Sequence, residues 1–221
     1  AFLSSVYRAV TLDVMWWLNQ KDTSDRGVFG GGFLGMDNIG VFDRDGALPT
    51  GGTLAQVDGT AWMATLVLQM LEITVELSHH DPTYLQMFGR WVWDGWLIAQ
   101  SLEQGAGGLS LWNESTGFYH DVIEMPDGSA TSLEVFSMQS VVPLFASVSI
   151  SRSDTEALST VDTAVRKVRA AYEIDTGFAP LRPKGGDGTH VLMAVVGHER
   201  LERMLARILD PDQFLSPHGV R

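Results

Sequence analysis

Cysteine is missing from this 221-residue chain, so disulfide bonds and thiolate metal sites are excluded. Positive charge is scarce, and the formal net charge of −12 disfavours nucleic acid or an anionic membrane as a partner. No apolar run is long enough to span a membrane, because polar residues such as Thr65, Gln69 and Gln139 interrupt the longest ones. The start, AFLSSVYRAV, lacks the cationic leader and unbroken apolar block of a signal peptide. These absences predict a cytoplasmic protein with neither a nucleic-acid nor a membrane partner.

What is present suits a folded globular protein. Hydrophobic residues make up 45% of the chain, and the length suits one domain over residues 1–221. Seven tryptophans are a high count. Aromatic rings beside carboxylates are typical of carbohydrate sites, although most tryptophans pack in a core.

Apolar residues recur at steps of three and four in several stretches, and this spacing predicts helices. The second helix follows Asp58, which we expect to cap it, and is apolar around most of its circumference. The third begins at Asp81-Pro82, a capping residue followed by proline, and ends at Gly105. The predicted helices span residues 3–18, 59–77, 82–104, 137–150, 153–172 and 198–209.

Between the third and fourth predicted helices the chain favours strands. The arms around Pro126-Asp127-Gly128, a turn sequence, predict a small β-hairpin. Helices joined by irregular loops, several of them buried nearly all round, indicate concentric layers of helices. The expected fold class is all-α, with the hairpin as an insertion.

One irregular segment, Gly30–Met63, reads GGGFLGMDNIGVFDRDGALPTGGTLAQVDGTAWM. Connections longer than about 15 residues are usually functional or disordered. Disorder is disfavoured because residues such as Phe33, Leu34 and Trp62 are too apolar for a solvated linker. We therefore expect a folded, functional loop that carries several carboxylates.

The stretch VFGGGFLGMDNIGVFDRDGALPTGGTLAQVDGTAWMA resembles the catalytic domain of glycoside hydrolase family 63, in its bacterial glucosidase-like branch akin to mannosylglycerate hydrolases. The stretches LDVMWWLNQKD, LWNESTGFYHDVI, SMQSVVPLFA and RLERMLARILDPDQFLSPHGVR extend the resemblance over nearly the whole chain. It implies an (α/α)6 toroid, in which an outer ring of helices surrounds an inner ring. It also implies hydrolysis of α-glycosidic bonds with inversion, without a metal or organic cofactor.

The family's general acid is an aspartate in a Gly-x-Asp loop, and Gly35-Met36-Asp37 matches that motif. The resemblance therefore implies Asp37 as the general acid. Apolar neighbours such as Phe33 and Ile39 favour the raised pKa that an acid needs near neutral pH. The residues expected to contact the sugar are Asp58, Trp62, Arg44, Gln56, Asn38, Trp17, Trp112 and Tyr119.

Most of these residues have a structural alternative. Asp58 suits a helix cap, and Arg44, between two aspartates, suits an ion pair that organises the loop. The four aromatic residues either stack on a sugar or pack in the core.

The family's general base is a glutamate in a downstream Gly- and Trp-rich motif, which this chain lacks. With about six of the toroid's helices, the chain matches the first half of the ring, and the base is expected outside it. An incomplete ring would expose apolar helix faces, which predicts self-association or pairing with the missing half. The other carboxylates in β-rich or loop positions are Glu114, Asp121, Glu124 and Glu134. None matches the base motif, and Asp121 is expected to brace the hairpin.

No metal site or cofactor is expected. Asp43-Arg44-Asp45-Gly46 begins like a calcium loop, but the later ligands do not follow. His198-Glu199 begins like a zinc-protease helix, but Glu202 stands where the second histidine belongs. The glycine-rich GGGFLG lacks the lysine and the following helix of a phosphate-binding loop.

The leading hypothesis is inverting hydrolysis of small α-glucosides or α-mannosides, glycosylglycerates included. One alternative is a carbohydrate-binding protein, or an inactive fragment, that binds sugar without turnover. Another is a helical interaction scaffold, which predicts no sugar affinity at all.

Overall fold

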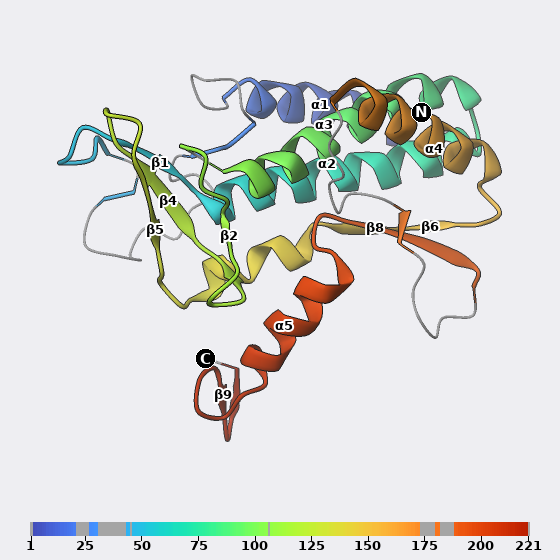
Figure 1. The fold of residues 1–221 in the computed structure, drawn as a ribbon. Helices are drawn as coiled ribbons and strands as arrows, with labels where there is room; N and C mark the ends of the chain where they lie inside the picture. The colour runs from blue at the N-terminus through green and yellow to red at the C-terminus, as the bar shows by residue number, and fades with distance from the viewer. Residues whose placement is uncertain are drawn as a thin grey trace.

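The computed structural model describes residues 2–20, 27–30, 43–44, 46–105, 107–172, 180–181 and 188–220. About 51% of this part is helix and 17% is strand, which makes the fold mixed α/β. The longer helices form one layer, with small antiparallel sheets beside and below it (Figure 1).

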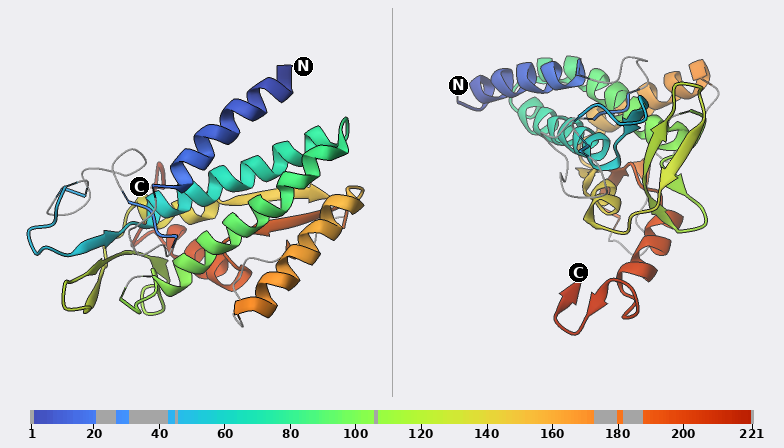
Figure 2. Two further views of the ribbon diagram at one scale, coloured as in Figure 1. Left: turned by 90° about the horizontal axis from the view of Figure 1, so that it is seen from above. Right: turned by 90° about the vertical axis from the view of Figure 1, so that its left-hand side faces the viewer.

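Within the described ranges, α1 packs on α2, α2 on α3, and α3 on α4, so these helices lie side by side (Figure 2). The helix α1 buries one stripe, formed by Tyr7, Val14 and Leu18, as its apolar spacing predicts. The last helix, α5, leaves this layer toward the C-terminus (Figure 1). The helices are α1 (Phe2–Leu18), α2 (Val57–Ser78), α3 (Leu85–Gln104), α4 (Thr155–Tyr172) and α5 (His198–Ile208).

The helix α2 is the centre of the core. Contrary to the expectation from the sequence, it is long and apolar enough to cross a membrane by length and composition alone. However, 67% of its most apolar window is buried inside the fold, which is the behaviour of a core helix. Its neighbours include fully buried aromatic residues of α3, such as Trp91 and Phe88.

The predicted hairpin is confirmed. Strand β4 (Asp121–Glu124) pairs antiparallel with β5 (Ala130–Leu133), and β1 (Thr53–Ala55) adds to the other edge of β4. Two short ribbons pair β2 (Trp112–Asn113) with β3 (Phe118–Tyr119), and β9 (Leu215–Ser216) with β10 (Gly219–Val220). The sheet β1–β4–β5 stands at the end of the molecule where α2 begins (Figure 1).

The expected all-α toroid is wrong, and the stretch 137–150 shows why. Instead of one helix it forms two short 3-10 helices, η2 (Met138–Ser140) and η3 (Val142–Phe145), and then the strand β6 (Ser147–Ser151). Pro143 lacks the N–H that a continuous helix needs. In β6, serines alternate with the buried Val148 and Ile150, a period of two that suits a strand with one buried face.

This strand belongs to a second three-stranded antiparallel sheet. Its order is β6–β8–β7, with β8 (His190–Ala194) paired to both β6 and β7 (Pro180–Leu181). Strand β6 lies against α2, so the sheet covers a face of the helical layer that a toroid would give to further helices.

The cap predicted at Asp58 is also wrong. The helix α2 begins at Val57, two residues before the predicted start, with Gln56 as its N-cap residue and no side-chain cap hydrogen bond. Asp58 therefore lies inside the first helical turn. The cap predicted at Asp81 is confirmed, because its side chain accepts from the backbone N–H of Thr83 at the start of η1 (Pro82–Tyr84).

Candidate functional site

The first turn of α2 gathers buried charged groups from three segments. Arg44 donates from Nη1 to Asp58 Oδ2 at 3.0 Å and from Nη2 to Asp58 Oδ1 at 2.6 Å. Its Nε donates to Asp121 Oδ2 at 3.0 Å, and Asp121 Oδ1 accepts from the backbone N–H of Val57 at 2.9 Å. The side chains of Arg44, Asp58 and Asp121 are 2%, 0% and 3% exposed. We call these three residues the charged cluster.

The charged cluster holds two carboxyl groups for one guanidinium. Burial raises the pKa of Asp121 to about 6 from an ordinary 3.8, although the charge of Arg44 and the Val57 N–H oppose this rise. Burial lowers the pKa of Arg44, but the hydrogen bonds and charges of the two aspartates outweigh it and raise that pKa overall. The guanidinium therefore stays charged, while Asp121 titrates in mildly acidic solution.

The residues on either side of the segment 31–42 are tied to the same turn of α2. On one side, the Phe29 N–H donates to Thr60 Oγ1 at 3.0 Å. On the other side, Arg44 holds Asp58, and the carbonyl oxygen of Arg44 accepts from Gln56 Nε2 at 2.9 Å. The expected acid Asp37 and the expected sugar ligand Asn38 fall within 31–42 and lie outside the described residues. The described residues on both sides of these two positions are thus held beside the charged cluster.

Two buried amide side chains lie against α2. Gln56 and Gln139 are each 1% exposed, and η2, which contains Gln139, packs on α2. The Oε1 atom of each has no hydrogen-bond partner among the residues described. Leaving a buried acceptor without a donor costs about 1–3 kcal/mol. A ligand with hydroxyl groups would supply such donors.

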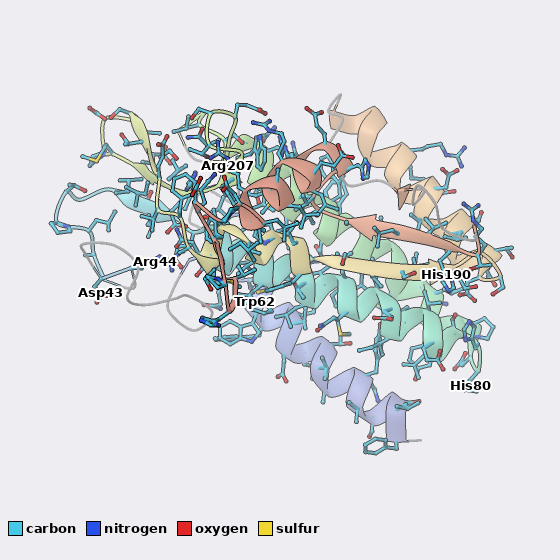
Figure 3. The ribbon with its side chains drawn as sticks, turned by 90° about the horizontal axis from the view of Figure 1, so that it is seen from below. Asp43, Arg44, Trp62, His80, His190 and Arg207 are labelled. Carbon is cyan, nitrogen blue, oxygen red and sulfur yellow. The ribbon has the colours of Figure 1, made fainter. Side chains whose placement is uncertain are left out.

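Of the four aromatic candidates, Trp62 lies on the same helix as Asp58 of the charged cluster. It follows Asp58 by one helical turn on α2 and is half-buried. Figure 3 shows Arg44 and Trp62 toward one end of the molecule and His80, just after α2, at the other. The half-buried Trp17 lies on α1, where its ring packs edge-on against Trp16 at 4.5 Å between centroids.

The other two aromatic candidates are covered by arginines. Trp112 and Tyr119, on β2 and β3, are 4% and 0% exposed. The guanidinium of Arg200, on α5, lies 4.8 Å from the Trp112 ring centre and 5.8 Å from that of Tyr119, and Arg203 lies 5.1 Å from Trp112. Arg200 also forms an ion pair with Glu103 at the end of α3. As placed here, the two rings join α5 to the body of the fold.

The remaining carboxylates from the sequence have structural partners. Glu114 pairs with Arg203, and Glu134 Oε1 accepts from Asn113 Nδ2 at 2.8 Å. Asp121 does tie the hairpin down, as expected, but its partner across 77 residues, Arg44, has no signal in the sequence. No group of three or more His, Asp or Glu side chains within the described ranges is arranged to hold a metal ion.

Comparison with known proteins finds a relative whose activity is not characterized. No protein-family model matches the chain, and no solved structure matches it. The chain is 38% identical over 236 residues to the uncharacterized protein YMR196W of Saccharomyces cerevisiae. That alignment takes in 100% of this chain and 21% of the yeast protein, so the chain spans about a fifth of the length of this curated relative. The name of the relative states no substrate or reaction.

Proposed function

We propose that the chain is part of an inverting α-glycoside hydrolase related to glycoside hydrolase family 63. Its substrates would be small α-glucosides or α-mannosides, glycosylglycerates included. The observation that carries the proposal is the anchoring of both flanks of the segment 31–42 beside the charged cluster. The described residues at the two ends of this segment, Phe29 and Arg44, are held beside buried polar groups of α2, and the role of Asp37 rests on the family resemblance of its sequence.

In this proposal Asp37 protonates the leaving oxygen, and a carboxylate from outside these residues activates water on the other side of the sugar. Inverting hydrolysis needs the two carboxyl groups about 6.5–9.5 Å apart. Asp58 and Asp121 are both bound by Arg44, so neither suits the role of base. Gln56 Oε1 and Asp58 would instead accept from sugar hydroxyl groups. The proposed reaction uses no metal or organic cofactor.

A second candidate is a carbohydrate-binding protein without catalysis. The observation that favours it is the pairing of Asp58 and Asp121 with Arg44, because this pairing gives both carboxylates a structural role. A helical interaction scaffold is the third candidate, and the exposed apolar face of α1 favours it. The same exposed face of α1 also supports the proposal that the hydrolase or the carbohydrate-binding protein self-associates or pairs with another segment.

The partner proposed for the site is a small glycoside, and neither a nucleic acid nor a membrane is proposed as a partner. The net charge of −12 supports the first exclusion, and the burial of α2 supports the second. We also propose a cytoplasmic location, which the lack of cysteine supports.

The test is proton NMR of the full-length protein of which this chain is proposed to be part, because the proposed general base lies outside these residues, with α-glucosides, α-mannosides and glycosylglycerates as substrates. An inverting hydrolase releases the β-anomer first, and Asp37→Asn should slow this release by about a hundredfold or more, because general acids contribute that much. The matched control is Asp127→Asn, an aspartate of the exposed hairpin turn that should leave turnover unchanged. Sugar binding without turnover would favour the second candidate. No binding of any of these sugars would overturn both.

A further inference from the structure

Phe145, which the sequence did not single out, is an exposed aromatic residue beside Trp62. Its side chain is 45% exposed, whereas Val142 and Pro143 of the same short helix η3 are buried. The packing of η3 on α2 therefore turns the buried residues inward and leaves the phenyl ring at the surface. A single exposed apolar residue is normal, but this one has an aromatic partner.

The rings of Trp62 and Phe145 lie 5.8 Å apart between centroids and are inclined by 41°. Inclined rings at this distance touch without covering each other. Both side chains keep solvent-accessible surface, Phe145 as an exposed residue and Trp62 as a half-buried one. The pair is assembled by the fold, because 83 residues separate its members in the sequence.

The pair stands next to the charged cluster. Trp62 lies four residues after Asp58 on α2, and residues at this spacing are neighbours on one helix face. An aromatic surface beside a few fixed polar groups is the arrangement that binds a molecule with both apolar and hydroxyl-bearing sides. A pyranose ring has this character, since its C–H groups form apolar patches and its hydroxyl groups surround them.

We propose that Trp62 and Phe145 form a stacking platform for the apolar face of a sugar ring, at the surface beside the first turns of α2. This inference rests on the proposed function and adds a binding residue to it. The covered rings of Trp112 and Tyr119 make a useful contrast, because Arg200 and Arg203 occupy their faces. Within the described residues, no arginine lies over the ring of Trp62 or Phe145.

The test is titration of the chain with methyl α-mannoside and methyl α-glucoside, followed by saturation-transfer NMR from aromatic protons to the sugar C–H protons. Phe145→Ala should weaken binding about three- to tenfold, the range expected for one lost aromatic contact. It should also reduce saturation transfer. Phe145→Tyr, which keeps the ring, should restore both. Phe2→Ala is the matched control, since Phe2 is 77% exposed on α1.

Thermal melting of each variant separates loss of the platform from loss of the fold. If the parent chain binds sugar and a folded Phe145→Ala variant binds it equally well, the platform is overturned while the proposed function stands. If the parent chain binds neither glycoside, both the platform and the proposed function are overturned.

Discussion

Arg44 and Asp58 form a two-pronged ion pair, with Nη1–Oδ2 and Nη2–Oδ1 distances of 3.0 and 2.6 Å and side chains 2% and 0% exposed. Asp121 binds the same guanidinium and the N–H of Val57. The cluster thus ties the residues after segment 31–42, the start of α2 and the start of β4 together. Such a buried network fixes the position of each segment as long as every member is present.

Arg44→Met should therefore destabilise the fold by about 3–5 kcal/mol, because it leaves two buried carboxylates without their cation. The free energy of unfolding is measured by urea titration. Arg166→Met is the control, since Arg166 and Asp162 form an exposed i,i+4 pair with side chains 70% and 64% accessible. That variant should change stability by less than about 1 kcal/mol. Similar losses in the two variants would contradict a structural role for the charged cluster.

The stability of the fold should depend on pH through Asp121. Burial raises the pKa of Asp121 to about 6, above its ordinary 3.8, so the folded state binds this proton more tightly than the unfolded state. Protonated Asp121 therefore contributes its full stabilisation below pH about 4. This stabilisation is lost as the pH rises toward about 6, and above that pH the free energy of unfolding no longer changes through Asp121. The expected decrease in the free energy of unfolding is roughly 3 kcal/mol.

Asp121→Asn removes this titration and keeps an oxygen for the Val57 N–H. The difference in unfolding free energy between the parent and the variant should therefore change between pH about 4 and about 6 and stay flat above it. Taking the difference removes the opposite slope from carboxyls with lowered pKa, such as Asp81 and Asp210. A difference that is flat over the whole range would show that Asp121 has an ordinary pKa.

The spacing of apolar residues predicted all five described α-helices to within a few residues, since each of them buries a stripe against a neighbour. For example, the helix predicted at 198–209 is His198–Ile208. The turn at Pro126-Asp127-Gly128 likewise predicted the hairpin, because a turn is encoded locally.

The sheet β6–β8–β7 was missed because its pairing is not local. The whole stretch 137–150 was interpreted as one apolar helix, although β6 itself alternates serines with Val148 and Ile150. Its pairing with β8, about 40 residues later, has no signal in the sequence. The charged cluster was missed for the same reason. Arg44 suggested an ion pair with its sequence neighbours, while its buried partners are 14 and 77 residues away.

The end of α3 offers a test of backbone geometry. Gly105 ends the helix with φ +58°, and a Cβ there would stand 1.8 Å from the carbonyl oxygen of Leu109. Gly105→Ala should therefore destabilise the fold by about 3 kcal/mol or more, from backbone strain and the steric clash together. Gly108→Ala is the control, because Gly108 has φ +76° but no atom within 4 Å of a Cβ. The Gly108→Ala variant should lose only about 1–2 kcal/mol of stability. Equal melting temperatures for the two variants would contradict the close approach of Leu109.

The outward face of α1 should drive self-association. Phe2, Leu12 and Trp16 are 77%, 72% and 54% exposed, and they lie opposite the stripe that packs on α2. Phe2, Ala9 and Trp16 follow one another at intervals of seven residues, a spacing typical of a helix that packs on a second helix.

Light scattering should show concentration-dependent dimers or larger species. Leu12→Lys should weaken this association at least about tenfold, since it removes a large apolar contact. Leu209→Lys is the control, because Leu209 is 58% exposed but lies beyond α5, on the other side of the fold. A parent chain that stays monomeric at every concentration, or equal weakening by the two variants, would show that the α1 face does not mediate association.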